Sequence, residues 1–371
     1  MLIFESEIAH LFDFQRMMKK IFFPPEWFPQ SAVQLTWPHE GTDWADMLDE
    51  VIPCFVAIAT EILKYEALIV VCRDQNVVRQ LIGEDHKNAL FIRELPSNDT
   101  WARDHGALSV FVDGVPCLYD FNFNAWGLKF PANLDNQLVF SIFGEKVFAP
   151  EVEYINEMPF VLEGGSIESD GEGTLLTTSE CLLSVNRNDS MDEKQIETYL
   201  IEKFGLKRVL WLRSGYLAGD DTDSHIDTLA RFCDARTIAY VPPGEESDEH
   251  TGELRLMENE LRSFRTLDGS PYRLVKLPMA DPVFYNGERL PATYANFLII
   301  NKAVLMPFYN SPKDEVVRYI LQRIFPDRAV VGVNCLPLLR QHGSLHCLTM
   351  QFPKGFVPEK DETDQFFLQM E

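Results

Sequence analysis

Two segments of the chain carry side chains that together could perform nucleophilic chemistry. Cys347 lies in the run His346-Cys347-Leu348-Thr349, and His225 lies in the run Asp223-Ser224-His225-Ile226-Asp227. The reactive form of cysteine is the thiolate, so Cys347 needs a base or a positive neighbour. An imidazole can both give and take a proton near neutral pH. Cys347 is therefore the candidate nucleophile, and His225 is the candidate general acid and base.

Asp227 is the first of several acids that could act with this pair. In an extended segment, residues two positions apart point to the same face, so His225 and Asp227 would enter one pocket together. The alternative is that Asp220-Asp221-Thr222-Asp223 is an acidic surface loop with His225 beside it by chance. A calcium loop is disfavoured because the remaining ligand spacing and the closing glutamate are missing.

Asp104 and Glu163 are the other candidate acids. Asp104 follows Arg103 and lies at the entry to a strand predicted over 107–112. Glu163 precedes Gly164-Gly165, a pair that lets the backbone approach a ligand closely. Each has a structural alternative: Asp104 could pair with Arg103 or cap a turn, and Glu163 could be a turn acid.

The number of acids indicates the kind of group that the site would bind. Two carboxylates can each accept a bidentate fork of N–H bonds from a guanidinium, which fixes the plane of that group and orients its carbon toward Cys347. Each charged hydrogen bond contributes about 1.5–3 kcal/mol. A protease would instead need an oxyanion hole for a neutral amide. The residue types therefore favour chemistry on a cationic, planar guanidino group.

Composition narrows the class of protein further. The 371 residues are 46% apolar and carry a net charge of −24, so a sizeable core is expected and nucleic acid and anionic membranes are disfavoured as partners. The seven cysteines include no CxxC pair, which argues against a disulfide framework and a zinc site. Glu5 and Glu7 stand where a signal peptide would be positive. We therefore expect a cytoplasmic protein without a cofactor or metal, and leave open a homo-oligomer.

Helical patterns along the chain are each followed by a short aliphatic run. Helices are predicted near 43–64, 74–85, 193–204, 249–265 and 312–325, and strands at 68–72, 89–92, 208–212, 272–276 and 329–333. Asp170-Gly171-Glu172-Gly173 predicts a hairpin turn. These five helix–strand units indicate an α/β protein with repeated architecture. We expect an N-terminal extension over 1–22, one catalytic domain over 23–358 and an acidic tail over 359–371.

Ordered motifs over most of the chain resemble the agmatine deiminase and bacterial peptidylarginine deiminase family, within the guanidino-group-modifying superfamily. The motifs are Pro25-Glu26-Trp27, Trp101-Ala102-Arg103-Asp104-His105-Gly106, Phe123-Asn124-Ala125-Trp126-Gly127, Glu163-Gly164-Gly165, Asn186-Arg187-Asn188, Asp221-Thr222-Asp223-Ser224-His225-Ile226-Asp227, Ala295-Asn296-Phe297 and His346-Cys347. The resemblance implies a five-bladed, pseudo-symmetric α/β propeller of the pentein type around a central site.

The resemblance also implies a role for each candidate residue. Cys347 matches the nucleophile and His225 the general acid and base, while Asp104 and Asp227 match the carboxylates that hold the guanidinium. Glu163 matches an acid that contacts the guanidinium and helps to keep His225 charged. Trp101 matches an aromatic wall of the pocket. The further predicted substrate contacts are Asp221, Gly165 and Trp126.

The implied reaction is hydrolysis of agmatine to N-carbamoylputrescine and ammonia through a thiouronium on Cys347, without a metal. The acidic composition favours agmatine, a dication without a carboxylate. Deimination of peptidyl or free arginine to citrulline is the alternative, and Arg340 is the obvious candidate to bind a substrate carboxylate. A non-catalytic propeller binding protein is a second alternative, disfavoured by the presence of Cys347 and His225. Ala107 and Ser224 stand where the family frequently has proline and glycine, and the resemblance places both positions at the rim of the pocket, where the substrate tail would lie.

Overall fold

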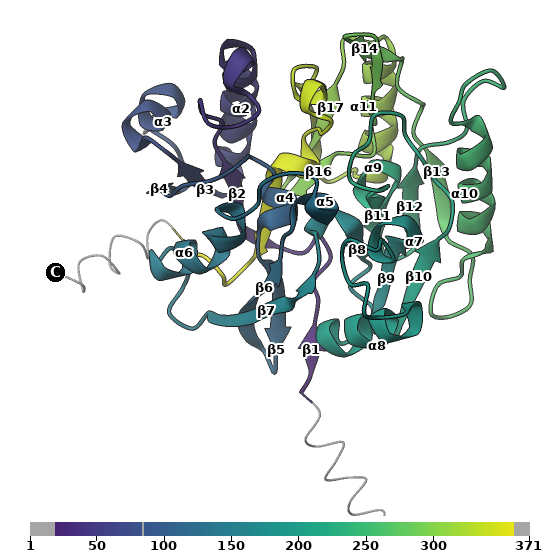
Figure 1. Ribbon diagram of the computed structural model, residues 1–371, viewed down its shortest axis with the longest axis horizontal. Coiled ribbons are helices and arrows are strands. Elements are labelled where there is room, and N and C mark those ends of the chain that lie inside the picture. The colour runs from purple at the N-terminus through teal and green to yellow at the C-terminus, as the bar shows by residue number, and fades with distance from the viewer. Residues whose placement is uncertain (1–18, 84, 360–371) are drawn as a thin grey trace, which may run out of the picture.

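The computed structural model describes residues 19–83 and 85–359 (Figure 1). The predicted N-terminal extension therefore lies outside the described residues up to residue 18, and the predicted acidic tail lies outside them from residue 360. Within the described part, no helix is long and apolar enough to cross a membrane.

Five sheets of the described residues share one strand order, in which an antiparallel pair is extended by a parallel strand. The helix that follows the middle strand provides the crossover to the parallel strand. The five helix–strand units predicted from periodicity are all confirmed, and the fold is mixed α/β. No sheet closes on itself in the described part of the chain.

Three of these sheets follow one another along the middle of the chain. The first contains β1 (Ile21–Phe22), β5 (Leu108–Val112), β6 (Val115–Asn122) and β7 (Glu153–Val161), with α5 (Ala125–Leu128), η2 (Asp135–Gln137) and α6 (Leu138–Gly144) before β7. The second contains β8 (Ile167–Ser169), β9 (Thr174–Thr178) and β10 (Arg208–Leu212), with α7 (Ser179–Leu182) and α8 (Glu193–Phe204). The third contains β11 (Ala230–Asp234), β12 (Thr237–Tyr240) and β13 (Arg273–Lys276), with α10 (Thr251–Ser263).

The remaining described strands form two further sheets and a two-stranded ribbon. One of these sheets pairs a strand near the start of the described chain with a strand near its end. The fourth sheet contains β16 (Leu298–Ile300), β17 (Ala303–Phe308) and β18 (Ala329–Asn334), with α11 (Lys313–Ile324). The fifth contains β19 (Thr349–Pro353), β2 (Gln30–Thr36), β3 (Ala67–Cys72) and β4 (Leu90–Glu94), with η1 (Ala45–Met47), α2 (Leu48–Leu63) and α3 (Gln75–Ile82). A separate ribbon pairs β14 (Val283–Tyr285) with β15 (Glu288–Leu290). Because β19 pairs with β2, the last described strand is hydrogen-bonded to a strand from the beginning of the described chain.

Local sequence signals explain where these elements begin and end. Helix α8 starts with a capping box in which the Asp192 side chain accepts from the Gln195 N–H and the Gln195 side chain accepts from the Asp192 N–H. The helix ends at Gly205, whose φ of +65° suits glycine. The predicted hairpin at 170–173 is confirmed, since β8 and β9 pair antiparallel across it.

In each of the five sheets, a short turn precedes one strand of the antiparallel pair, namely β5, β8, β11, β16 or β19. These turns gather in the middle of the molecule. They are α4 (Ala102–His105), η3 (Gly164–Ser166), α9 (Ile226–Leu229), the turn before β16, and η5 (His346–Leu348), while η4 (Leu338–Gln341) precedes η5. Helix α4 contacts η3 and η5, and α9 contacts η3. In Figure 1, α4 and α9 lie between the surrounding sheets. The repeated topology thus brings equivalent turns from distant parts of the chain together.

Candidate active site

Cys347 lies in η5 and is almost completely buried, with 7% of its surface exposed. Its Sγ lies 3.4 Å from Asn296 Oδ1 and 4.0 Å from Asp227 Oδ2. Burial, together with the charges of Asp227 and Asp104, raises the pKa of the Cys347 thiol well above its usual value. The free protein therefore holds a neutral thiol, and a cation placed beside it would favour the thiolate.

Asp104 is fixed by two N–H donors. Its Oδ2 accepts from Trp126 Nε1 at 2.9 Å, and its Oδ1 accepts from the Gly165 N–H at 2.9 Å. Burial raises the pKa of Asp104 despite the nearby His225. The alternative ion pair with Arg103 is absent among the described residues, because the Arg103 guanidinium lies toward Glu26, with its Nη2 3.7 Å from Glu26 Oε2.

Asp227 presents one engaged and one free oxygen. Its Oδ2 lies 2.8 Å from His346 Nδ1, whereas its Oδ1 is buried without a hydrogen-bond partner among the described residues. Burial alone would raise the pKa of Asp227, but the hydrogen bond and charge of His346 hold it below its usual value. Asp227 is therefore a carboxylate with acceptor capacity left for a ligand.

His225 lies beside Asp104, with its Nδ1 3.6 Å from Asp104 Oδ1. Its Nε2 has no hydrogen-bond partner among the described residues. Burial alone would lower the pKa of His225, but Asp104, Cys181 and Glu163 raise it well above 6.5. His225 is therefore an imidazolium that can donate a proton within the site. The extended segment predicted around it is wrong, because Ile226 already begins α9.

Gly165 makes the close packing of these groups possible. A Cβ at this position would lie 2.7 Å from His225 Nδ1, 2.8 Å from Asp104 Oδ1 and 3.1 Å from Asp227 Oδ2. Any side chain here would displace the three groups from one another. The glycine predicted to contact the substrate therefore also determines how near His225 and the two aspartates can lie.

Glu163 has a partner that sequence reasoning did not assign. Arg187 Nε lies 2.9 Å and 3.0 Å from the two carboxylate oxygens of Glu163, whose side chain is completely buried. The same guanidinium donates to Asp223 Oδ2 at 2.6 Å and to the Thr222 carbonyl at 2.9 Å. Arg187 thus ties Glu163 to the loop before His225, and direct contact of Glu163 with a substrate stays a prediction.

A cavity of about 150 Å³ leads to Cys347. Its walls include Trp101, Trp126 and Phe130, and its lining also contains three aspartates, Asp43, Asp99 and Asp221. Burial raises the pKa of Asp99 to about 7 and that of Asp221 to about 6. Among the described residues, no lysine or arginine lines the cavity. The predicted contacts Trp101, Trp126 and Asp221 therefore lie with Asp104 and Cys347 around one hollow.

Two buried clusters have metal-ligand side chains, but each already contains a guanidinium partner. They are Glu163, Cys181 and His225, and Glu26, Glu168 and His346. Arg187 pairs with Glu163, and Arg231 pairs with Glu26 at 2.8 Å and with Glu168. A divalent cation would have to compete with a buried arginine for the same oxygens. The donor sets therefore fit ion pairs better than a metal.

A family model described as Porphyromonas-type peptidyl-arginine deiminase matches residues 22–353. The chain belongs to this family. It is 36% identical to an agmatine deiminase of Pseudomonas syringae pv. syringae (strain B728a), over 89% of this chain and 95% of that protein.

Solved structures of relatives share the fold. A putative arginine deiminase from Porphyromonas gingivalis is 56% identical, with a TM-score of 0.89 over 91% of this chain and 100% of that one. An agmatine deiminase of C. jejuni with substrate bound is 39% identical, with a TM-score of 0.85 over 91% of this chain and 97% of that one.

Asn296 was missed as a site residue, although its motif contributed to the family resemblance. Its Oδ1 accepts from the His346 N–H at 2.8 Å and lies 3.3 Å from the Cys347 N and 3.4 Å from Sγ. It immediately precedes the fourth shared sheet, just as Asp104, Glu163, Asp227 and Cys347 precede the other four. The predicted helix–strand units do not include β16, so the position of Asn296 before this strand became visible only in the structure.

Proposed function

We propose that this protein is an agmatine deiminase, which hydrolyses the guanidinium of agmatine to N-carbamoylputrescine and ammonia. The observation that carries the proposal is the cavity itself. Cys347 and Asp104 lie with three further aspartates in its lining, and no described lysine or arginine does. A ligand with a positive charge at each end, separated by a slender apolar chain, complements this lining.

The side chains can be given roles by their geometry. Asp104 and the free Oδ1 of Asp227 hold the guanidinium beside Cys347, and its positive charge lowers the cost of ionising the buried thiol. A bond forms between Sγ and the guanidinium carbon, and one C–N bond breaks. His225 protonates the leaving ammonia and becomes a neutral imidazole, while the proton of the thiol passes to solvent as the thiolate forms. Water then attacks the thiouronium, loses a proton to His225 and releases the ureido product together with the thiol.

The alternative substrates carry groups that the cavity does not complement. Free arginine has a carboxylate that would face the aspartates of the cavity, whose lining includes His342 but no described lysine or arginine. Arg340, the predicted candidate for such a partner, instead pairs with Glu50 at 2.8 Å and lies over the Tyr285 ring. Peptidyl arginine remains the second candidate because the family model carries that description.

We also infer that the five shared sheets stand as blades of a pseudo-symmetric propeller. The common strand order, the contacts among the turns that precede the first strands, and the pairing of β19 with β2 support this arrangement. The site would then occupy the centre, where each blade contributes one turn.

A substrate panel tests the function. Agmatine, free arginine and a blocked arginyl peptide are compared for release of ammonia and ureido product. We expect kcat/KM for agmatine to exceed the other two by at least about tenfold, the worth of one charged hydrogen bond. Faster turnover of the peptide would overturn the assignment in favour of a peptidylarginine deiminase.

Matched aspartate variants sharpen the panel. Asp221→Asn removes a charge from the cavity lining and is expected to raise KM for agmatine while leaving the slow reaction with the peptide unchanged. Asp49→Asn removes an exposed charge on α2, outside the cavity lining, and serves as the control. Equal effects of both variants would mean that general surface charge, and not the cavity, attracts the dication.

A further inference from the structure

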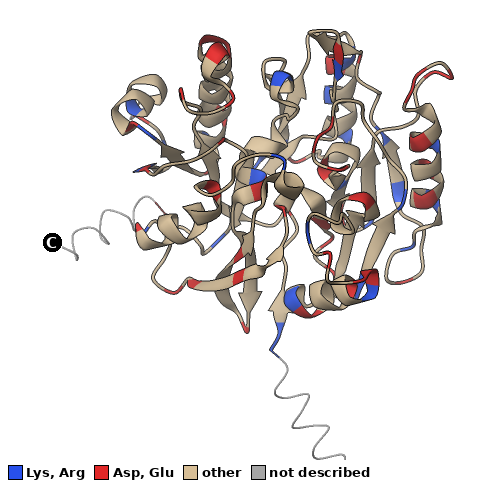
Figure 2. Cartoon of the chain, in the orientation of Figure 1, with Lys and Arg blue, Asp and Glu red and all other residues tan. Residues whose placement is uncertain are grey.

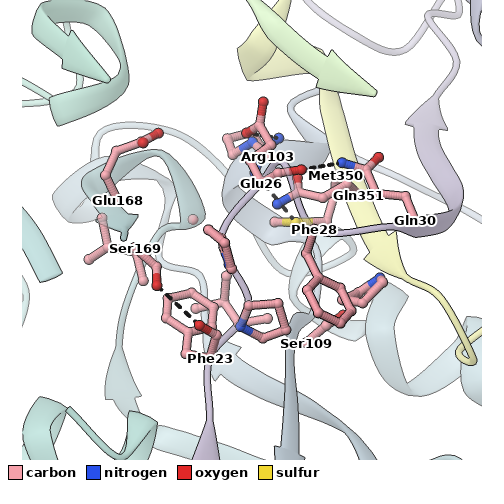
Figure 3. A pocket seen from close by; sticks show the side chains of 16 residues that line it. Phe23, Glu26, Phe28, Gln30, Arg103, Ser109, Glu168, Ser169, Met350 and Gln351 are labelled. Carbon is pink, nitrogen blue, oxygen red and sulfur yellow. Dashed lines mark hydrogen bonds and ion pairs between the residues drawn. The ribbon is translucent and has the colours of Figure 1, made fainter. Parts of the chain in front are cut away.

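Behind the candidate active site, His346 connects Asp227 to a second buried carboxylate. His346 Nδ1 lies 2.8 Å from Asp227 Oδ2, and His346 Nε2 lies 2.6 Å from Glu26 Oε2. At most 8% of each of these three residues is exposed. Glu26 also lies in the wall of a separate cavity of about 40 Å³, where Figure 3 shows it beside Arg103. The contacts of His346 therefore connect Asp227, in the candidate active site, to the separate cavity beside Glu26.

The geometry determines the protonation state of His346. Each ring nitrogen lies within hydrogen-bond distance of a carboxylate oxygen, and only the imidazolium donates from both nitrogens. A neutral ring would point a lone pair at one of the two carboxylates. His346 therefore carries a positive charge between Asp227 and Glu26.

The surrounding charges agree with this state. The charged groups around the ring and its two partners are Glu26, Glu168, Asp227, Arg103 and Arg231, with Asp104 and His225 beside Asp227 and with Glu66 and Arg328 near Glu26. Both oxygens of Glu168 accept N–H bonds, from Arg231 Nε and from the Phe232 backbone, so this group binds as a carboxylate. The imidazolium of His346 places a positive charge between two of these carboxylates, in a region from which water is largely excluded.

Glu26 is held from several directions and can anchor the ring. Its Oε1 accepts from the Ile299 N–H at 2.7 Å, and its Oε2 accepts from Arg231 Nη2 at 2.8 Å as well as from His346. Burial alone would raise the pKa of Glu26, but Arg231, His346 and Arg103 lower it far below its usual range. The anchor is therefore a fixed, ionised carboxylate.

The consequence for Asp227 is orientational and electrostatic. With Oδ2 committed to His346, its side chain cannot rotate without losing a charged hydrogen bond, and Oδ1 stays available for a ligand. His225 and Arg231 also favour the charge of Asp227, but His346 is the cation that hydrogen-bonds to it. A carboxylate this deeply buried that loses such a partner binds a proton more readily and attracts a guanidinium less.

We propose that His346 is a positioning residue for deimination: anchored by Glu26, its imidazolium holds Asp227 ionised and turned with Oδ1 toward the substrate guanidinium. This role rests on the proposed function, since it needs a guanidinium for Asp227 to bind. The competing explanation is that His346 only neutralises the buried cluster and stabilises the fold. The two explanations differ in which of its two contacts matters for turnover.

Two amide substitutions separate the contacts. The amide nitrogen of asparagine lies near the place of histidine Nδ1, and that of glutamine lies near Nε2. His346→Asn therefore keeps a donor to Asp227, whereas His346→Gln keeps a donor to Glu26. We expect His346→Gln to lose at least about 100-fold in kcat/KM for agmatine, and His346→Asn to lose about tenfold or less. A His346→Gln enzyme more active than His346→Asn would overturn the proposal.

The pH dependence provides a readout that a purely structural role would not move. With a neutral residue at position 346, Asp227 would take up a proton at higher pH, so the acidic limb of kcat/KM should shift upward in both variants. His250 is a suitable control, because it is buried and its Nδ1 lies 2.6 Å from Asp248, away from the cavity lining. His250→Asn is expected to leave the acidic limb in place. An unshifted limb in both His346 variants would contradict the proposal.

A spectroscopic measurement separates this proposal from the proposed function. In the full-length protein with ¹⁵N-labelled histidine, the signals lost in His346→Asn should show both ring nitrogens bonded to hydrogen at the pH of the activity assay, as the two short contacts indicate. A neutral ring there, in an enzyme that deiminates agmatine, would refute the His346 bridge alone. A wild-type protein with the protonated ring that converts none of the guanidino substrates would instead refute the proposed function and, with it, the positioning role.

Discussion

Asp104→Asn tests the candidate site most directly, because the structure specifies what the amide changes. Each oxygen of Asp104 accepts from one N–H group, Trp126 Nε1 and Gly165 N, both at 2.9 Å. Asparagine has one carbonyl oxygen and one NH2 group, so in either orientation it places an NH2 against one of these donors. Leaving that donor unpaired costs about 1–3 kcal/mol of stability. Part of this cost is offset, since burial already opposes the charge of Asp104.

The expected loss of activity is larger than the loss of stability. Removing one charged partner of a desolvated cation costs about 3–5 kcal/mol. At about 1.36 kcal/mol for each factor of ten, kcat/KM for agmatine should fall by roughly two to four powers of ten. Asp104 also raises the pKa of His225, from 3.6 Å away. The variant should therefore lose its imidazolium at lower pH, and the basic limb of the rate profile should move down.

The assay combines ammonia release across pH with thermal unfolding. Asp120→Asn is the control, because Asp120 is buried and accepts from the Tyr154 hydroxyl at 2.6 Å, outside the cavity lining. It should change the melting temperature and leave the rate intact. The reasoning fails if Asp104→Asn melts several degrees lower but keeps more than a tenth of the wild-type kcat/KM, since Asp104 would then be a structural residue.

Three further predictions follow from the same geometry. Cys347→Ser should abolish ammonia release while calorimetry still detects agmatine binding, because a hydroxyl is far harder to ionise than a thiol; substantial residual turnover would exclude Cys347 as nucleophile. EDTA should leave activity unchanged because arginines already occupy both buried carboxylate clusters; inactivation that added metal reverses would contradict that view. Burial raises the pKa of Asp99 to about 7, so KM for agmatine should fall as the pH rises through 7 and Asp99 becomes charged. A KM that shows the same pH dependence in Asp99→Asn would remove Asp99 from substrate binding.

The repeated architecture could be predicted from the sequence because helix and strand periodicity is encoded within short windows. The patterns at 193–204 and 208–212 coincide with α8 and β10. The predicted strand over 107–112 is found as β5, one residue shorter. What periodicity could not provide was the arrangement of the units in space, because the strand pairings that join distant segments depend on the whole chain.

The candidate chemistry was also visible before the structure. Few residue types can act as a nucleophile, a proton donor or a ligand for a cation, and the motifs that contain them here are distinctive. Residue chemistry and family resemblance could therefore select Cys347, His225, Asp104 and Asp227. The structure brings all four together around Gly165 and the base of the cavity. Their roles in turnover remain predictions that the variants above test.

Only the tertiary structure decided which partners these groups have. Glu163 is engaged by Arg187, Asn296 lies against the thiol, and His346 bridges Asp227 to Glu26, which is 320 positions away in the chain. Sequence spacing determines which residues share a strand or a helix face, but it does not determine which charges are buried together. In a buried site, the charge of a carboxylate depends on its nearest partner. The protonation states of this site could therefore be assigned only from the three-dimensional structure.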